Sequence, residues 1–437
     1  MSRTAGQLSP LYRRLPHGPN GMQREEVARN QRARLYGAMI ESISQRGYEA
    51  TSVAHVIALA GVSRRAFYEQ FSNKEQCFLA SYDIVLARAR SRAIAAWRRE
   101  HGWANRLHAS CKVLFDDVAE SPKGPRLALV DVLAVGPRGR ERMQLADAAF
   151  ERLLAAALQA APDGIEFPAL TARAVVGGVH NILLRRVLEH REHELYTLSD
   201  EVLDWIESYR APGAARLSAL GAADRPDLRP AAAVFPARGE ERSRAIGSLV
   251  ELTLNEGYAR LSDPQIADFA GVSIEAFHAH FAGKEDCLLA ILDEFQRQAL
   301  AAVTVALHGA PTWPQAVHRA MSALAAYLDS HRALARVALI EVYEVGPAAI
   351  GRMSNSTEAC TELLEQGAPG PCRGPLVARE AITGAIWAIV SGYVASDRQS
   401  RPPWLADQLA FTVLAPYLGS RGALQGINRA RRSPRAV

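Results

Sequence analysis

Residues 61–76 read GVSRRAFYEQFSNKEQ, a pattern that predicts a tight turn followed by a short helix. Gly61 suits the turn, because glycine alone adopts positive φ without a steric cost. Ser63 can cap the helix, since its hydroxyl can accept a bond from an unpaired N–H of the first turn. Phe67 and Phe71 lie four residues apart and therefore on one helix face. This face is expected to pack into a core and to leave the opposite face outward.

Two further helices are expected before this turn. Residues 25–46 repeat apolar side chains every fourth position at Leu35, Met39 and Ile43, which indicates a helix. Ser52 can cap a short second helix that ends at the Gly61 turn. A short third helix on such a scaffold, with its N-terminal residues pointing outward, has the geometry that enters the major groove of DNA.

The same frame recurs 210 residues later, as GVSIEAFHAHFAGKED at 271–286. Residues 61–80 and 271–290 match at 11 of 20 positions, and the register continues through Gly136-Pro137 and Gly346-Pro347. A period this long indicates a duplicated domain, because solenoid repeats run about 20–50 residues.

The chain is expected to be all-α, because helical spacing recurs throughout and no sustained period-2 alternation appears. The predicted segments are a disordered basic arm at 1–24, a first helix-turn-helix domain at 25–72, a first helical ligand-binding and dimerisation domain at 73–210, a linker at 211–237, a second helix-turn-helix domain at 238–282, a second helical ligand-binding and dimerisation domain at 283–419, and a basic tail at 420–437 that we interpret as a solvated, disordered end.

Composition excludes several classes of protein. The 437 residues are 49% hydrophobic and 22% charged, with a net charge of +5, as in ordinary globular proteins. No apolar run approaches the roughly 18–20 residues that span a bilayer. The five cysteines form no Cys-x-x-Cys pair, which argues against a disulfide framework or a zinc site. We therefore expect a cytoplasmic protein with no membrane contact, no cofactor and no metal.

The run from Ala38 to Ala80 resembles the N-terminal domain of the TetR family of bacterial repressors, and residues 245–290 resemble a second one. The resemblance rests on the order Gly-Tyr, Gly-Val-Ser, Phe-x-x-x-Phe and Lys-Glu, which occurs in both copies. It implies that the N-terminal residues of the third helix read base edges and contact phosphates. An arginine can hydrogen-bond guanine O6 and N7, and an amide such as Gln70 can bond adenine. The predicted DNA-binding residues of the first copy are Ser52, Ser63, Arg64, Arg65, Tyr68, Gln70 and Lys74.

The second copy lacks the two arginines. Its candidate DNA-binding residues are Ser273, His278, His280 and Lys284. Glu275 would face a groove lined by phosphates, and affinity for DNA depends largely on cations that neutralise phosphates. Two alternatives remain open: the second copy contacts DNA, or it has lost DNA binding and acts through ligand or protein contacts.

The resemblance also implies a dimer interface and a pocket for an inducer. The last helix pair of each copy would pair either within one chain, as an intramolecular pseudo-dimer, or between chains, as a homodimer. The candidate pocket residues are Trp97, Trp103, Cys111, Phe115, Phe150, Trp313, Met321, Tyr327 and Tyr343.

No nucleophile–base pair, metal-binding pattern or phosphate-binding loop is visible, so we expect no enzyme. The sequence predicts a DNA-binding transcriptional regulator, in the manner of a repressor, that a small apolar ligand releases from or retains on a double-stranded DNA operator. The alternative is a non-enzymatic ligand-binding or protein-interaction regulator whose second unit has lost DNA binding.

Overall fold

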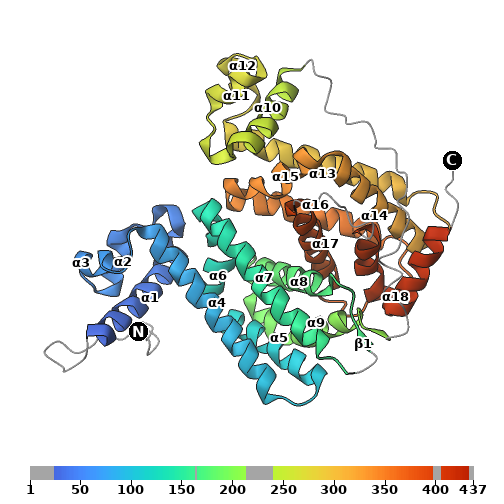
Figure 1. Cartoon of the computed structure of the whole chain (residues 1–437), viewed down its shortest axis with the longest axis horizontal. Helices are drawn as coiled ribbons and strands as arrows, with labels where there is room; N and C mark the ends of the chain where they lie inside the picture. The colour runs from blue at the N-terminus through green and yellow to red at the C-terminus, as the bar shows by residue number, and fades with distance from the viewer. Residues whose placement is uncertain (1–23, 163–164, 213–239, 397–404, 433–437) are drawn as a thin grey trace, which may run out of the picture.

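The computed structural model describes residues 24–162, 165–212, 240–396 and 405–432 (Figure 1). Its architecture is all-α, as predicted, in two consecutive units of the same design. Among the described residues, the only strand pairing is a two-residue antiparallel bridge between β1 (Ile165–Glu166) and β2 (Ala211–Pro212). Nearly all of the predicted basic arm and linker lies outside the described residues.

Each unit consists of a small helix-turn-helix domain followed by a larger helical body. The first unit comprises α1 (Arg24–Ala50), α2 (Val53–Ala60), α3 (Arg64–Tyr68), α4 (Lys74–Arg99), α5 (Trp103–Glu120), α6 (Lys123–Leu129), the 3₁₀ helix η2 (Asp131–Val135), α7 (Pro137–Gln159), α8 (Thr171–Leu188), η3 (Glu192–Thr197) and α9 (Ser199–Glu207). The second comprises α10 (Glu241–Glu256), η5 (Tyr258–Arg260), α11 (Asp263–Ala270), α12 (Ile274–His280), α13 (Lys284–Leu307), α14 (Trp313–Ser330), α15 (Arg332–Leu339), η6 (Glu341–Val345), α16 (Pro347–Glu365), α17 (Ala378–Ala395) and α18 (Leu405–Arg432).

The helix-turn-helix domains fold as their sequences predict. Leu35, Met39 and Ile43 of α1 are buried in the core that also holds Phe67 of α3 and Phe71, which lies three residues beyond the end of α3. The Phe71 ring centre is 6.0 Å from that of Tyr36 in α1. The turn between α2 and α3 is left-handed at Gly61, with φ 60°, and its counterpart Gly271 has φ 63°. Both turns therefore require the residue that the sequence supplies.

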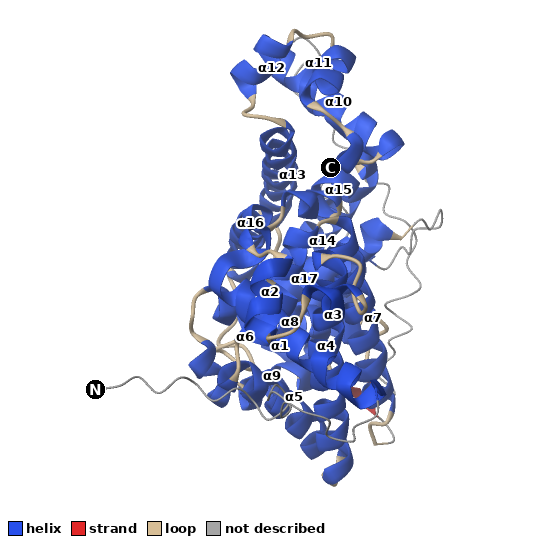
Figure 2. Cartoon of the chain, turned by 90° about the vertical axis from the view of Figure 1, so that its left-hand side faces the viewer, coloured by secondary structure: helices blue, strands red, loops and turns tan. Residues whose placement is uncertain are grey.

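Two long helices carry the helix-turn-helix domains away from the bodies. In Figure 1, α1–α3 project to the left of the first body and α10–α12 stand above the second. Figure 2 shows the same arrangement after a quarter turn, with α13 connecting α10–α12 to the rest of the molecule. Each domain therefore has an accessible outer surface.

The units pair within one chain, through α8 of the first and α17 of the second, which cross at the centre of the molecule (Figure 1). Glycines permit a close approach. A Cβ on Gly177 would lie 2.7 Å from the Gly384 carbonyl oxygen, and one on Gly178 would lie 2.8 Å from that of Ala381. The side-chain amide of Asn181 donates to the Glu380 carbonyl at 2.8 Å. Of the two pairing alternatives, the structure has the intramolecular one.

A second contact between the units joins the residues that follow α9 to α18. Pro416 lies inside α18 and has no N–H to donate to the carbonyl of Thr412, four residues earlier. The hydroxyl of Tyr209 donates to that carbonyl instead, at 3.0 Å, and the Tyr209 ring packs on Phe411. The first unit thus satisfies a backbone acceptor that the helix of the second unit leaves unpaired.

The C-terminal end differs from the prediction. α18 bends at Gly419, where φ is 66°, and then continues to Arg432. Ala423, Leu424 and Ile427 are buried, and Arg431 pairs with Asp407. Residues 420–432 therefore form a packed helix and not a solvated tail, because apolar side chains recur at helical spacing between the arginines.

None of the described helices combines the length and hydropathy that crossing a membrane requires.

Candidate nucleic-acid interface and ligand cavity

The N-terminal face of α3 presents two guanidinium groups to solvent. The Ser63 hydroxyl accepts a bond from the Ala66 amide at 3.1 Å and so fixes where the helix begins, as predicted. Arg64 and Arg65 follow it, and the side chain of Arg65 is 89% exposed. Tyr68, one turn later, is 47% exposed. The predicted residues of α3 therefore lie together on the outer surface of the domain.

These side chains have only weak partners. Arg65 pairs with Glu69 at 2.9 Å, and the guanidinium carbon of Arg64 lies 5.8 Å from the centre of the Tyr68 ring. An exposed ion pair of this kind is worth about 0.2–1 kcal/mol. A phosphate or a guanine edge can therefore displace it at small cost.

Other predicted DNA-binding residues have internal partners. Ser52 caps α2, and its hydroxyl accepts from the His55 amide at 3.3 Å. Gln70 accepts a bond from Arg32 at 3.0 Å. The ammonium of Lys74 donates to the Tyr48 carbonyl at 2.9 Å and lies 4.0 Å from the Tyr48 ring centre. Lys74 therefore ties the start of α4 to the end of α1, a role that the sequence reading missed.

The second helix-turn-helix has the same frame but a different charge. Ser273 caps α12, accepting from Ala276 at 3.1 Å. His278 lies 3.7 Å from Asp263 and His280 lies 3.8 Å from Glu241. Both candidate cations on α12, His278 and His280, therefore have a carboxylate beside them.

Two neighbouring residues complete this picture. The ammonium of Lys284 donates to the Leu261 carbonyl at 2.8 Å, which repeats the internal role of Lys74. Hydrogen bonds from its own backbone and from Ser273 lower the pKa of the Glu275 carboxyl, so α12 begins with a firmly ionised acid. The surface around α12 therefore attracts a phosphate group less strongly than the surface of α3 does.

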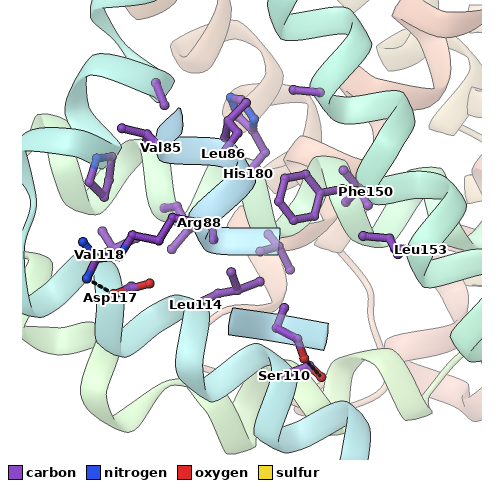
Figure 3. Close-up of a pocket in the computed structure, with 18 of the residues that line it drawn as sticks. Val85, Leu86, Arg88, Ser110, Leu114, Asp117, Val118, Phe150, Leu153 and His180 are labelled. Carbon is purple, nitrogen blue, oxygen red and sulfur yellow. Dashed lines mark hydrogen bonds and ion pairs between the residues drawn. The ribbon is translucent and has the colours of Figure 1, made fainter. Parts of the chain in front are cut away.

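A cavity of about 820 Å³ lies within the first unit, bounded by α1 and α4–α9 (Figure 3). Most of its lining is apolar, including Leu86, Leu114 and Leu153. Its volume lies in the usual range for small-molecule pockets, about 300–1,000 Å³. The body of the first unit therefore has room for a ligand.

Three of the five pocket residues predicted for this unit line the cavity: Trp97, Cys111 and Phe150. The other two lie elsewhere. Trp103 donates its indole N–H to the Ala157 carbonyl at 2.7 Å, and Phe115 is fully buried in the core. Helical spacing identifies an inward face, but it does not distinguish a side chain that fills the core from one that borders a void.

The cavity also has polar groups that the sequence reading missed. Arg88 and Arg92 of α4 face Asp117 of α5, and Lys123 of α6 pairs with Glu41 of α1 at 2.7 Å. Of these, all but Arg92 line the cavity. These residues come from four separate helices, so no spacing in the sequence connects them.

His180 of α8 is a further polar group in the lining, 3.7 Å from Asp147. Burial alone would lower its pKa, but the hydrogen bond and charge of Asp147 outweigh burial and raise it. The imidazole therefore gains protons more readily than a free histidine does.

The four pocket residues predicted for the second unit do not line this cavity. Met321 is fully buried and Trp313 donates to the Leu364 carbonyl at 2.7 Å. The Tyr327 hydroxyl contacts Gln298 at 3.3 Å, and that of Tyr343 accepts from Trp387 at 3.0 Å. These side chains have partners within the second body.

Comparisons with known proteins agree with this architecture. The sequence model of the bacterial regulatory proteins of the tetR family matches residues 37–81 and 249–291, which are the two helix-turn-helix regions. A curated relative, the HTH-type transcriptional activator FasR of Mycolicibacterium smegmatis, is 26% identical over 127 residues. That match covers 29% of this chain and 58% of FasR, so the chain spans little more than half of this relative's length.

Solved structures of single-unit length also match. The fatty acid degradation regulator FadR from Bacillus halodurans is 16% identical, with 40% of this chain and 94% of that chain covered and a TM-score of 0.36. FadR from Bacillus subtilis, solved in complex with stearoyl-CoA, is 17% identical, with 40% and 96% covered and a TM-score of 0.36.

Two helix-turn-helix domains, each followed by a helical body, define a DNA-binding transcriptional regulator. The chain belongs to the TetR family, and it carries two TetR-like units in tandem.

Proposed function

We propose that this regulator binds its operator through the first helix-turn-helix domain and that a small ligand in the first unit's cavity changes its affinity for DNA. One observation carries the proposal: α4 belongs to both sites. Its first turns place Cys77 and Phe78 in the core of the helix-turn-helix domain, where the Phe78 ring packs on Tyr48 of α1, and farther along Val85 and Trp97 line the cavity. A ligand that moves α4 therefore moves the DNA-reading helix.

The proposed mechanism is a shift of population between two positions of α4. A ligand shifts such an equilibrium only by its difference in affinity for the two states. An occupant of the cavity contacts α4 along several turns and so has the means to favour one position. We propose that the ligand-bound position releases the operator, which would make the chain a repressor that its ligand inactivates.

The lining favours an amphipathic ligand with an acidic head. The interior is apolar, and the cations Arg88, Arg98 and Lys123 lie among the lining residues together with the carboxylates of Glu41, Asp117 and Asp147. Arg88 and Lys123 pair with Asp117 and Glu41, which leaves Arg98 to meet an anionic head. An apolar tail would gain about 25 cal/mol for each Å² that it buries, while an anionic head would pair with an arginine or lysine. Long-chain acyl compounds meet this description, and stearoyl-CoA is a suitable first probe.

Ligand binding is tested by filling the cavity. Leu114→Trp places an indole in the void, whereas Leu145→Trp adds the same side chain at an exposed position of α7. We expect stearoyl-CoA to weaken DNA binding by the wild type and by the Leu145→Trp variant, but not by Leu114→Trp. If all three proteins respond equally to stearoyl-CoA, the cavity is not the ligand site.

DNA binding is tested by selecting genomic fragments on the full-length protein and footprinting the enriched site. Replacing Arg64 and Arg65 with alanine should weaken binding at least tenfold, since each good arginine–guanine pair is worth about 1–3 kcal/mol. It should also reduce the salt dependence of binding. The control removes Arg99 and Arg152, which are exposed outside the helix-turn-helix and carry the same total charge. Equal losses in both variants would refute a specific role for α3.

The alternative function, in which the second unit does not bind DNA, is favoured by the carboxylates beside His278 and His280. It predicts that alanine at both histidines leaves operator affinity unchanged. A loss as large as that from Arg64 and Arg65 would instead indicate that both units read DNA.

A promoter–reporter assay decides the sign of regulation. Repression predicts higher expression when the gene for the regulator is deleted and when the ligand is supplied, whereas activation predicts lower expression on deletion.

A further inference from the structure

Ion pairs between the units have a consistent direction. Arg140 pairs with Glu341 at 3.0 Å and with Glu344 at 3.2 Å. The other cross-unit ion pairs in the described parts of the chain are Arg185–Glu358 at 3.0 Å and Arg186–Glu380 at 2.8 Å. Every cation in these pairs belongs to the first unit, and every carboxylate belongs to the second. The interface therefore joins a cationic face to an anionic one.

Arg186 is the most buried member, with a side chain only 4% exposed. Arg186 also faces Glu194 of the first unit, whose carboxylate oxygen lies 2.9 Å from the Arg186 Nε. A buried charge that loses its partner keeps the cost of leaving water without the compensating attraction. Loss of the pairing between Arg186 and Glu380 should therefore destabilise the interface more than loss of any other of these ion pairs.

This pair has no symmetric counterpart. α8 and α17 correspond in sequence, so that Arg186 is equivalent to Gly392 and Glu380 to Ala174. A pseudo-two-fold axis between the helices relates the contact of Arg186 with Glu380 to a contact of Gly392 with Ala174. Two copies of one unit, paired through this face, could not form the ion pair at either end.

Pairing of two first units is also opposed by repulsion. In the structure, Gly392 lies against the Arg173 guanidinium, and a Cβ on Gly392 would be 2.9 Å from the Arg173 Cζ and closer still to its Nη1. A first unit in place of the second would bring Arg186 to that position. Arg186 of each first unit would then lie against Arg173 of the other, once on each side of the two-fold axis. In the native pairing a glycine, Gly392, lies against Arg173 instead.

Pairing of two second units would leave carboxylates without partners. Glu380 would face Gly392, and Glu358 would face Ser391, the counterpart of Arg185. At two of these positions the first unit offers no substitute, since Glu358 corresponds to Ala148 and Glu344 to Ala134; the counterpart of Glu341 is Asp131, which keeps a carboxylate at that one position.

We propose that this directional charge pattern, with Arg186–Glu380 as its decisive pair, makes each unit complementary to the other and not to itself. The partner that fits the first unit's face is a second unit, from the same chain or from another copy. The inference concerns assembly and does not depend on DNA or ligand binding.

The test exchanges the charges in the full-length chain. Arg186→Glu and Glu380→Arg should each lower the thermal unfolding midpoint by several degrees, because each leaves like charges in a buried contact. The double variant restores opposite charges and should recover at least half of the combined loss. The control makes the same exchange at Arg142 and Asp83, a pair within the first unit. It should leave the mass in solution at that of one chain, 47.5 kDa.

Mixing provides a second readout. When the two single variants are refolded together, each chain's first unit finds an opposite charge on the other chain's second unit. We expect a one-to-one mixed dimer, detected by energy transfer between differently labelled chains, and no such dimer between the wild type and the double variant. The proposal fails if the double variant is no more stable than the sum of the single losses predicts, or if the wild type and the double variant form mixed dimers as readily as the single variants do.

Discussion

Gly384 lies where the two units approach most closely, so its replacement by alanine tests how the units are held together. A Cβ at this position would lie 2.5 Å from the Asn181 Cβ and closer still to the Gly177 carbonyl oxygen. Backbone lies on one side and a short side chain on the other, so neither neighbour can turn away. α8 and α17 would have to separate by about 1 Å to restore ordinary contact, and a gap of that size forfeits a quarter to a half of the dispersion energy of the atoms that part.

The expected cost follows from two opposing effects. Overpacking of a close contact costs about 1–3 kcal/mol, and more where backbone must move. Alanine also gains about 1 kcal/mol over glycine inside a helix. Because the clash involves backbone of both helices, the cost should lie toward the upper end of this range, so that Gly384→Ala lowers the free energy of unfolding by about 1–2 kcal/mol overall.

Gly351→Ala is the matched control. Gly351 also lies inside a helix of the second unit, α16, and a Cβ there would meet nothing within 4 Å. It should raise the free energy of unfolding by about 0.5–1 kcal/mol. Urea unfolding followed by circular dichroism measures both variants. If Gly384→Ala stabilises the protein as Gly351→Ala does, the close crossing of α8 and α17 is not present in solution.

Two further predictions concern buried polar groups. Burial raises the pKa of the Asp131 carboxyl from 3.8 to about 6, so the fold favours the protonated form, and the stability present below pH 4 is lost as the pH rises through 6. Asp131→Asn should therefore be more stable than the wild type by about 3 kcal/mol at pH 7 and equal to it near pH 4, as measured by urea unfolding across this range; a constant difference would contradict the assignment. Tyr209→Phe leaves the Thr412 carbonyl without a donor, because Pro416 cannot supply one, and should cost about 1–3 kcal/mol of unfolding free energy. The exposed Tyr196→Phe should change the same measurement by less than about 0.5 kcal/mol, and equal effects would refute this role for the hydroxyl.

The helix-turn-helix could be predicted from sequence because its rules are local. Ser63 caps the helix that it precedes, Gly61 makes the turn that it occupies, and Phe67 and Phe71 share a face because they lie one turn apart. The duplication was visible for the same reason, since the same local frame recurs around Gly271.

Features that depend on distant residues were not predictable in this way. The choice between pairing within a chain and between chains rests on contacts such as Arg186 with Glu380, which lie 194 positions apart. The outline of the cavity depends on seven helices, so that Trp97 and Phe150 line it whereas Phe115 fills the core. Lys74 looked like a phosphate contact because its environment could not be seen, and the structure places its ammonium on the Tyr48 carbonyl. Whether it also contacts DNA stays a prediction.

Joining the two units in one polypeptide has a consequence for a cell that makes few copies of this protein. A regulator built from two separate chains falls apart on dilution, once its concentration drops below the dissociation constant of the pair. Here the partners of α8 and α17 are covalently connected, and a tether of this kind sets an effective concentration that dilution does not change. A single molecule therefore reaches its target already assembled. Occupancy of the target should then rise in proportion to the concentration of the protein, and not in proportion to the square of that concentration.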